Sequence, residues 1–180
     1  MDYAKLNQTI IDKVMAALAL INNPEIDPQV RQLNQEILFR TVGTAVYAKV
    51  YDMNAYDMEI EHTTGPGIDD RHFGLAKVAS ASVATGTLGL REYVKNFLDY
   101  SASQAQNDAM RNARESGKFP TMDRSTNGKT CKWCQGKAGH YENPEPSDFH
   151  RHGGCDCNIV TQGYKSRNGL LDNYVKPKDR

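Results

Sequence analysis

The sequence predicts an α+β protein, with an N-terminal helical region followed by a small module built on short β-strands. Two observations lead to this prediction. Apolar residues recur at helical spacing in much of the first 117 residues, and all four cysteines of the 180-residue chain lie between residues 131 and 157. We expect three regions: a mainly helical region over residues 1–117, the cysteine-containing module over residues 118–162, and an extended tail over residues 163–180.

The helical region begins with a predicted helical hairpin. The apolar residues of the first helix recur on one face and stop before Asn22-Asn23-Pro24; they are Leu6, Ile10, Val14, Leu18 and Ile21. The second helix should start at Asp27-Pro28, with Asp27 as the N-cap and Pro28 at the position where its missing N–H costs nothing.

The second helix is predicted to reach about Asn54, and a third long helix follows later in the chain. The apolar stripe of the second helix, interpreted as core rather than as a partner surface, comprises Val30, Leu33, Ile37, Val42, Ala45 and Val46. The third helix has one apolar side and should end at Gly117 as its C′ residue; that side comprises Leu90, Val94, Phe97, Leu98, Ser101 and Ala105.

Charge divides the chain in two. The formal net charge is zero, but residues 1–110 contain nine basic and fourteen acidic residues, a net charge of −5, and residues 111–180 contain thirteen and eight, a net charge of +5. This asymmetry indicates two faces with different neighbours, and a solvated dipole is the alternative interpretation. The mean hydropathy of −0.65 indicates an elongated or assembly-dependent protein. Since no apolar run approaches the length of a membrane span, we expect no membrane partner.

The cysteines form two close pairs, Cys131-Lys-Trp-Cys134 and Cys155-Asp-Cys157, with His150 and His152 just before the second pair. Two pairs of soft ligands joined by a loop are typical of a tetrahedral Zn²⁺ site, and six donors are available for four positions. The predicted module is therefore a zinc knuckle, with a short strand that carries Cys155 and Cys157, because these cysteines share strand parity with Ile159. Structural zinc contributes roughly 10 kcal/mol or more in zinc-finger peptides, which would organise a loop-rich segment.

A disulfide framework is the main alternative for the cysteines. The chain shows no secretory leader, so the thiols are expected to stay reduced. A redox-active Cys-x-x-Cys is expected at a helix start on a βαβ scaffold, which the sequence around Cys131 does not predict.

These motifs resemble the C-terminal signature of the phage Mu protein F-like head morphogenesis family, the minor capsid or minor head proteins of tailed bacteriophages. The resemblance covers about residues 111–160. Residues that match the family pattern are Cys131, Cys134, Gly139, His152, Cys155 and Cys157, with Arg124 and Gly128 upstream. The family often has Pro-Asn before the penultimate cysteine and Arg between the last two; this chain has Gly153-Gly154 and Asp156 there.

The resemblance implies a non-enzymatic virion protein, located in the capsid interior or near the portal and in the host cytoplasm during assembly. Its role would lie in head assembly, portal-proximal organisation, or DNA packaging or ejection within a multi-subunit assembly. Partners would be the major capsid or portal proteins, and packaged DNA through the basic C-terminal half. The expected ligands of a structural Zn²⁺ are Cys131, Cys134, His152 and one or both of Cys155 and Cys157. His150 is the reserve, and His140 is expected to be an ordinary surface histidine.

Other functions of a zinc module stay open. A zinc-ribbon nucleic-acid binder would use the lysines around the knuckle and stack Trp133 on a base. The site of an endonuclease of the His-Asn-His type could be formed by Asp148, His150, His152 and Asn158. A zinc deaminase is disfavoured, because His140-Tyr-Glu142 follows the Cys-x-x-Cys instead of preceding it. Three or four thiolates would close the coordination sphere of the metal, which favours a structural over a catalytic site.

Overall fold

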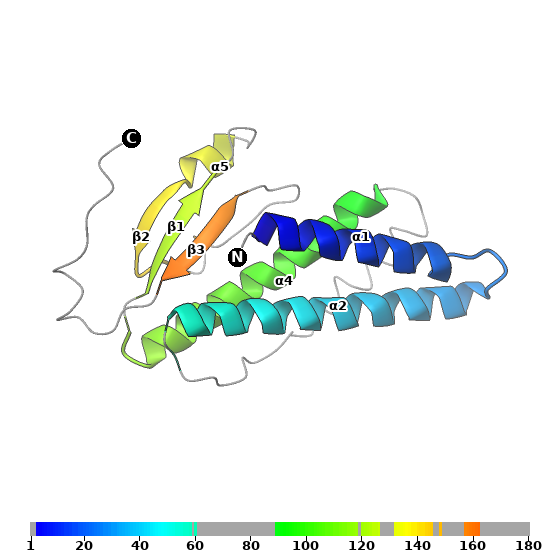
Figure 1. Cartoon of the computed structure of the whole chain (residues 1–180), viewed down its shortest axis with the longest axis horizontal. Helices are drawn as coiled ribbons and strands as arrows, with labels where there is room; N and C mark the ends of the chain where they lie inside the picture. The colour runs from blue at the N-terminus through cyan, green and yellow to red at the C-terminus, as the bar shows by residue number, and fades with distance from the viewer. Residues whose placement is uncertain are drawn as a thin grey trace.

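The computed structural model describes residues 3–58, 60, 89–118, 120–126, 132–145, 148 and 157–162; for residues 3–7, 158 and 160–162 it describes the backbone alone. The helices are α1 (Tyr3–Ile21), α2 (Pro28–Asp57), α4 (Leu90–Glu115) and the short α5 (Lys132–Gly136). The strands are β1 (Thr121–Ser125), β2 (Gly139–Glu142) and β3 (Asn158–Gln162). Long helices come first and a small sheet follows (Figure 1), so the α+β class is confirmed.

The predicted hairpin of α1 and α2 is present, and its second helix starts as expected. The Asp27 carboxylate accepts hydrogen bonds from the backbone N–H groups of Gln29 (2.8 Å) and Val30 (3.3 Å), and Pro28 is the first helical residue. Asp27 therefore satisfies two of the N–H groups that a helix start leaves without a partner.

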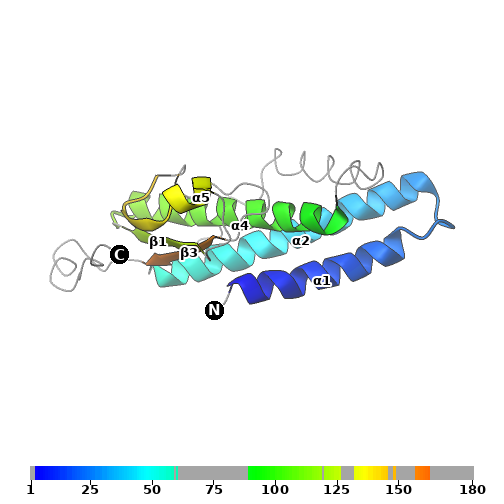
Figure 2. The ribbon, with the colours of Figure 1, turned by 90° about the horizontal axis from the view of Figure 1, so that it is seen from above.

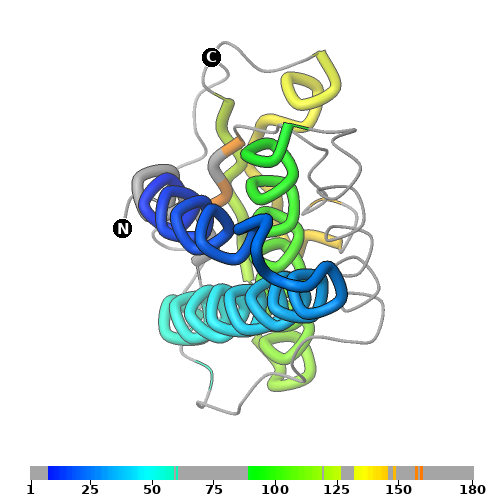
Figure 3. The backbone as a smooth tube through the Cα atoms, turned by 90° about the vertical axis from the view of Figure 1, so that its right-hand side faces the viewer, coloured from blue at the N-terminus to red at the C-terminus, as the bar shows by residue number. Residues whose placement is uncertain are grey.

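The main core lies where α2 and α4 pack together. Phe39 of α2, which is 1% exposed, meets the rings of Tyr93 and Phe97 of α4 edge to face at centroid distances of 6.0 and 5.2 Å. Further along, α4 contributes small, fully buried residues that allow close approach of the helices; these are Ala102, Ala105, Ala109 and Ala113. Figure 3 looks roughly along α1 and α2 and shows these two helices side by side, with α4 crossing beside them.

The interpretation of the whole α2 stripe as core is wrong. Val46 is buried, but Ala45 is exposed, and Val30, Leu33 and Ile37 are exposed by 46, 57 and 52%. Figures 1 and 2 show part of the reason: the loop end of the hairpin extends beyond the start of α4, so α4 does not cover it. Ala45 lies further along α2, on the side that faces α1. The face of α2 that is buried also includes residues that a search for apolar side chains passes over, such as Gln35, Gly43 and Asn54.

The end of α4 is the one predicted from Gly117. This glycine has φ +73°, and its N–H bonds to the Arg114 carbonyl, while the N–H of Lys118 bonds to the Ala113 carbonyl, each at 2.9 Å. This pair of hydrogen bonds is the Schellman motif, which favours glycine because a side chain is strained at positive φ.

The three strands form an antiparallel sheet in the order β2-β1-β3. Met122 of β1 and Ile159 of β3 are buried in the same core as the helices, and the Gln106 side chain of α4 donates to the Ile159 carbonyl at 3.4 Å. The end of α4 falls at the predicted boundary near residue 117, whereas the division into three regions stays a prediction. The tail over residues 163–180 lies outside the described residues.

Among the helices that the structure describes, none combines the length and the apolar character needed to cross a membrane.

Candidate metal centre

Two of the predicted ligands, Cys134 and Cys157, come together in the structure. Cys134 lies on α5, and Cys157 directly precedes β3; they are 0 and 4% exposed and form a buried cluster of their own. A segment from each predicted cysteine pair therefore converges on one buried place, as a four-ligand site with paired ligands requires.

The other candidates, Cys131, His152, Cys155 and the reserve His150, lie outside the described residues. Within the described ranges, no three His, Cys, Asp or Glu side chains gather as a metal site. Two cysteines of the predicted set fall in those ranges, so the ligand set stays a prediction. The strand that was expected to carry the second cysteine pair, β3, begins only at Asn158, so Cys157 lies just before the strand and not on it. Cys155 lies outside the described residues.

Arg124 of β1 is the residue that accompanies the two cysteines. It is 2% exposed; its Nη2 group donates to the Cys157 sulfur at 3.6 Å, and its Nη1 group donates to the Asp148 carbonyl at 2.8 Å. Its Nε–H is buried and has no acceptor among the described residues. Burial of a guanidinium costs free energy unless anions and hydrogen-bond acceptors surround it. This environment therefore favours negative charge near the sulfur.

Trp133, between the two cysteines of the first pair, covers this arginine. The guanidinium carbon of Arg124 lies 5.3 Å from the centroid of the Trp133 ring, within the range of a cation–π contact, and the tryptophan is 43% exposed. The indole thus lies between the buried arginine and the surface.

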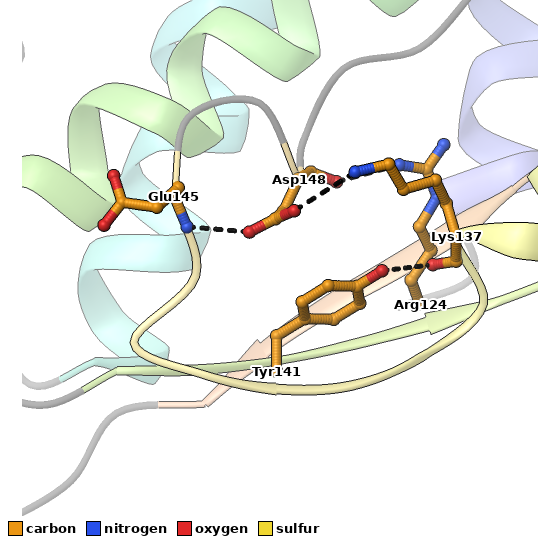
Figure 4. A network of polar contacts seen from close by, with 5 residues as sticks. All are labelled: Arg124, Lys137, Tyr141, Glu145 and Asp148. Carbon is orange, nitrogen blue, oxygen red and sulfur yellow. Dashed lines mark hydrogen bonds and ion pairs between the residues drawn. The ribbon is translucent and has the colours of Figure 1, made fainter.

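Asp148 connects the parts of the module (Figure 4). Its carboxylate forms an ion pair with Lys137 at 3.4 Å and accepts the backbone N–H of Glu145 at 2.9 Å. The Tyr141 hydroxyl donates to the Lys137 carbonyl at 2.8 Å, while the Asp148 carbonyl accepts the bond from Arg124. These contacts tie Asp148 to β1, to the end of β2 and to the turn after α5.

A second connection fixes the module to the helices. Asn143 has φ +50°, and its side-chain and backbone oxygens accept hydrogen bonds from Arg114 of α4 at 2.7 and 3.0 Å. The Asn143 N–H donates to the Pro120 carbonyl at 2.9 Å. An asparagine tolerates this left-handed conformation better than most residues, so the corner is locally favourable.

His140 is not the surface histidine that the sequence suggested. Its side chain is 15% exposed, and its Nδ1 atom lies 2.7 Å from the Asp123 carboxylate on the neighbouring strand β1. The two residues are register partners in the sheet, which explains how the contact arises. His140 therefore links β2 to β1.

In the sequence, Arg124 was indicated only by the family pattern. Asp148 was a candidate only as one residue of a possible His-Asn-His nuclease site. The available signal for Arg124 was strand parity. Met122 and Arg124 alternate with the more exposed Asp123 and Ser125, which places them on one face of β1. A long basic side chain on the buried face of a strand requires a partner.

Comparison of the chain with protein-family models, curated proteins and solved structures finds no match. The resemblance to the Mu F-like family therefore stays a prediction that rests on the motif residues.

Proposed function

We propose that this chain is a structural minor capsid or head morphogenesis protein of a tailed phage, organised by a structural Zn²⁺. It would assist head assembly, portal-proximal organisation, or DNA packaging or ejection, in contact with capsid or portal proteins. Two observations support the proposal: the cysteine–histidine signature over residues 131–157, and the burial of Cys134 with Cys157 beside Arg124.

The surroundings of the cysteine pair fit a zinc–thiolate centre. A Zn²⁺ ion bound by three or four thiolates carries a net negative charge, which would balance the buried guanidinium of Arg124. Hydrogen bonds from outer groups to ligating sulfurs are a usual feature of such centres, and the Arg124 Nη2 group already donates to Cys157. A further thiolate of the predicted set, from Cys131 or Cys155, is the kind of acceptor that the Arg124 Nε–H lacks.

The same arrangement favours a structural over a catalytic role. A centre with three or four thiolates leaves no open position for a substrate or an activated water. The Asp148 carboxylate, one member of the alternative nuclease constellation, is instead held by Lys137 and by the Glu145 N–H. A nuclease would need that carboxylate directed at a metal or a water.

Metal content tests the zinc part of the proposal. Native mass spectrometry of the purified protein should find one zinc ion per chain, which a strong chelator removes together with the fold of residues 118–160. Cys134→Ser and His152→Gln should lower zinc occupancy, whereas His140→Gln, a matched change at a histidine outside the ligand set, should retain it. Protein without zinc and with four free thiols would refute the metal centre.

Assembly tests the virion part separately. The purified protein should co-sediment with procapsids or with isolated portal and should leave plasmid DNA intact in Mg²⁺ or Mn²⁺. Cleavage that disappears in His150→Ala or His152→Ala would instead establish the nuclease alternative. Failure to associate with either assembly would refute the virion role even if zinc is present.

A further inference from the structure

A groove of about 360 Å³ runs between α1 and α2. Its α1 wall includes Ile10 and Val14, and its α2 wall includes Leu38, Val42 and Val46. Every lining residue belongs to one of these two helices, so the groove is a feature of the hairpin and not of the helical core with α4.

The α2 side of the groove has the spacing that a docked helix would require. Lining residues recur every three or four positions from Leu38 to Val50, along one face of the helix. At 1.5 Å per residue this face is about 18 Å long, or roughly three helical turns. A neighbouring face of α2, which includes Phe39 and Tyr47, packs against α4. Among the described residues, no third element covers the groove face.

The charge of the groove differs from that of the region around it. Lys13 and Lys49 line the groove from opposite walls, both are exposed, and neither forms an ion pair within the described part of the chain. No Asp or Glu of the described residues lines the groove. Several basic residues elsewhere on the helices do form ion pairs: Arg40 with Glu36, Arg91 with Asp12, and Lys95 with Asp99. Since residues 1–110 carry a net charge of −5, two lysines that have no carboxylate partner among the described residues stand out at an apolar groove.

We propose that this groove binds an amphipathic helix of a partner protein that carries Asp or Glu residues beside its apolar face. Apolar anchors at helical spacing would enter between Ile10, Val14 and Val42, and the flanking carboxylates would meet Lys13 and Lys49, which is the helix-in-groove mode of recognition. The inference does not depend on the zinc centre or on the virion role.

A second copy of this chain is a poorer candidate to occupy the groove. Its exposed apolar residues on α2 include Leu33 and Ile37, which are flanked by uncharged Gln32 and by Glu36. Glu36 already pairs with Arg40 at 2.7 Å. Beside Leu33 and Ile37, a second copy therefore offers a carboxylate that is already paired, whereas an acidic helix of a partner protein would supply carboxylates to both lysines.

A peptide experiment tests the proposal. The probe is a fluorescent helical peptide of three to four turns, with Leu at i, i+3, i+4 and i+7 and Glu on both flanks; its control replaces each Glu by Lys. We expect the acidic peptide to bind the full chain about 5- to 10-fold more tightly in fluorescence anisotropy, because two rim ion pairs differ between the probes. The Lys13→Glu/Lys49→Glu double variant should reverse this preference.

Two alanines of α2 provide a matched pair of variants. Ala45 and Ala48 are both exposed, but Ala45 lines the groove and Ala48 does not. Ala45→Glu should abolish binding of the acidic peptide, and Ala48→Glu should leave it unchanged. Absence of binding, equal affinity for both peptides, or equal effects of the two variants would each overturn the proposal.

Sedimentation velocity of the wild-type chain distinguishes the second-copy alternative. A monomer that still binds the acidic peptide supports the proposal. A dimer that Ala45→Glu dissociates and Ala48→Glu leaves intact would show that the groove is filled by another copy, which would overturn the inference of an acidic partner.

Discussion

The helical core and the sheet module place different chemistry in their interiors. The contact of α2 with α4 buries aromatic and aliphatic side chains such as Phe39, Leu98 and Val94, all at most 1% exposed. Next to the sheet, the smaller buried cluster consists of Cys134 and Cys157, with Arg124 beside it. One interior is stabilised mainly by apolar burial and also encloses polar contacts such as that of Tyr47 with Asp108. The other depends on polar contacts and, as we propose, on a metal.

This difference indicates which part of the protein responds to which disturbance. Apolar burial is non-directional and tolerates changes in charge or redox state, whereas a buried arginine and two thiols depend on the right partners. The two regions are still joined, because Met122 and Ile159 belong to the helical core and Arg114 binds the Asn143 corner. Loss of the module should therefore weaken the helices without unfolding them.

The largest effect is expected from a change within the helical core. Phe39→Ala removes a ring that is 1% exposed and contacts Tyr93 and Phe97, so we expect the free energy of unfolding to fall by about 3–5 kcal/mol. Urea unfolding followed by far-UV circular dichroism measures it. Leu33→Ala on the same helix, at a side chain 57% exposed, should change the free energy by less than about 0.5 kcal/mol. Equal losses would contradict the assignment of the core.

A change at Arg124 should act on the module instead. Arg124→Met keeps much of the volume but removes the hydrogen bonds to the Asp148 carbonyl and the Cys157 sulfur, at a cost of about 1.5–3 kcal/mol. Hydrogen exchange should become faster in β1, β2 and β3 and stay unchanged in the middle of α4. The control is Lys132→Met at an exposed position of α5. Faster exchange throughout α4 would show that the two regions unfold together.

The N-cap of α2 should contribute less to the free energy of unfolding than Phe39 or Arg124 does. Asp27→Ala removes the acceptor of the Gln29 and Val30 N–H groups, so we expect a loss of about 1 kcal/mol in thermal or urea unfolding. Asp52→Ala removes the same charge from an exposed position within the same helix and should have almost no effect. If both variants lose the same stability, charge and not capping would be the cause.

The last prediction concerns a decline in stability at alkaline pH, which vanishes below pH 10. Burial raises the pKa of Tyr93 from 10.0 to about 12, because the phenolate is disfavoured in the partly buried environment beside Phe39. The unfolded chain therefore loses its proton first. The contribution to stability is present below pH 10 and is lost as the pH rises from 10 to 12. In urea unfolding at several pH values, Tyr93→Phe should weaken this decline, whereas Tyr56→Phe, at a side chain 75% exposed, should preserve it.

Local signals predicted the helices well. The Asp27-Pro28 start, the apolar face of α4 and the end at Gly117 each depend on residues close in sequence, and each is present. The exposed part of the α2 stripe was mispredicted because burial depends on how far α4 extends, which no local pattern states. His140 was mispredicted for a similar reason, since its partner Asp123 is reached through strand register.

The candidate centre was predictable in part. Cysteine spacing alone indicated that both pairs belong to one site, and Cys134 and Cys157 do meet although 23 positions separate them in the chain. Strand parity indicates only that Arg124 lies on the buried face of β1. Its contact with Cys157 requires β1 to lie between the other strands and to turn that face toward the cysteines.

By itself, then, the sequence determined the α+β class, the helix ends and the identity of the residues that can bind a soft metal, since backbone preferences and ligand chemistry are properties of single residues and short spacings. Only the tertiary structure decided that Arg124 is buried against Cys157, that the Asp148 carboxylate holds the module together, and that an apolar groove with two lysines lies between α1 and α2. These features join residues far apart in the chain, and their energies depend on burial and on the opposing partner, which no local segment contains.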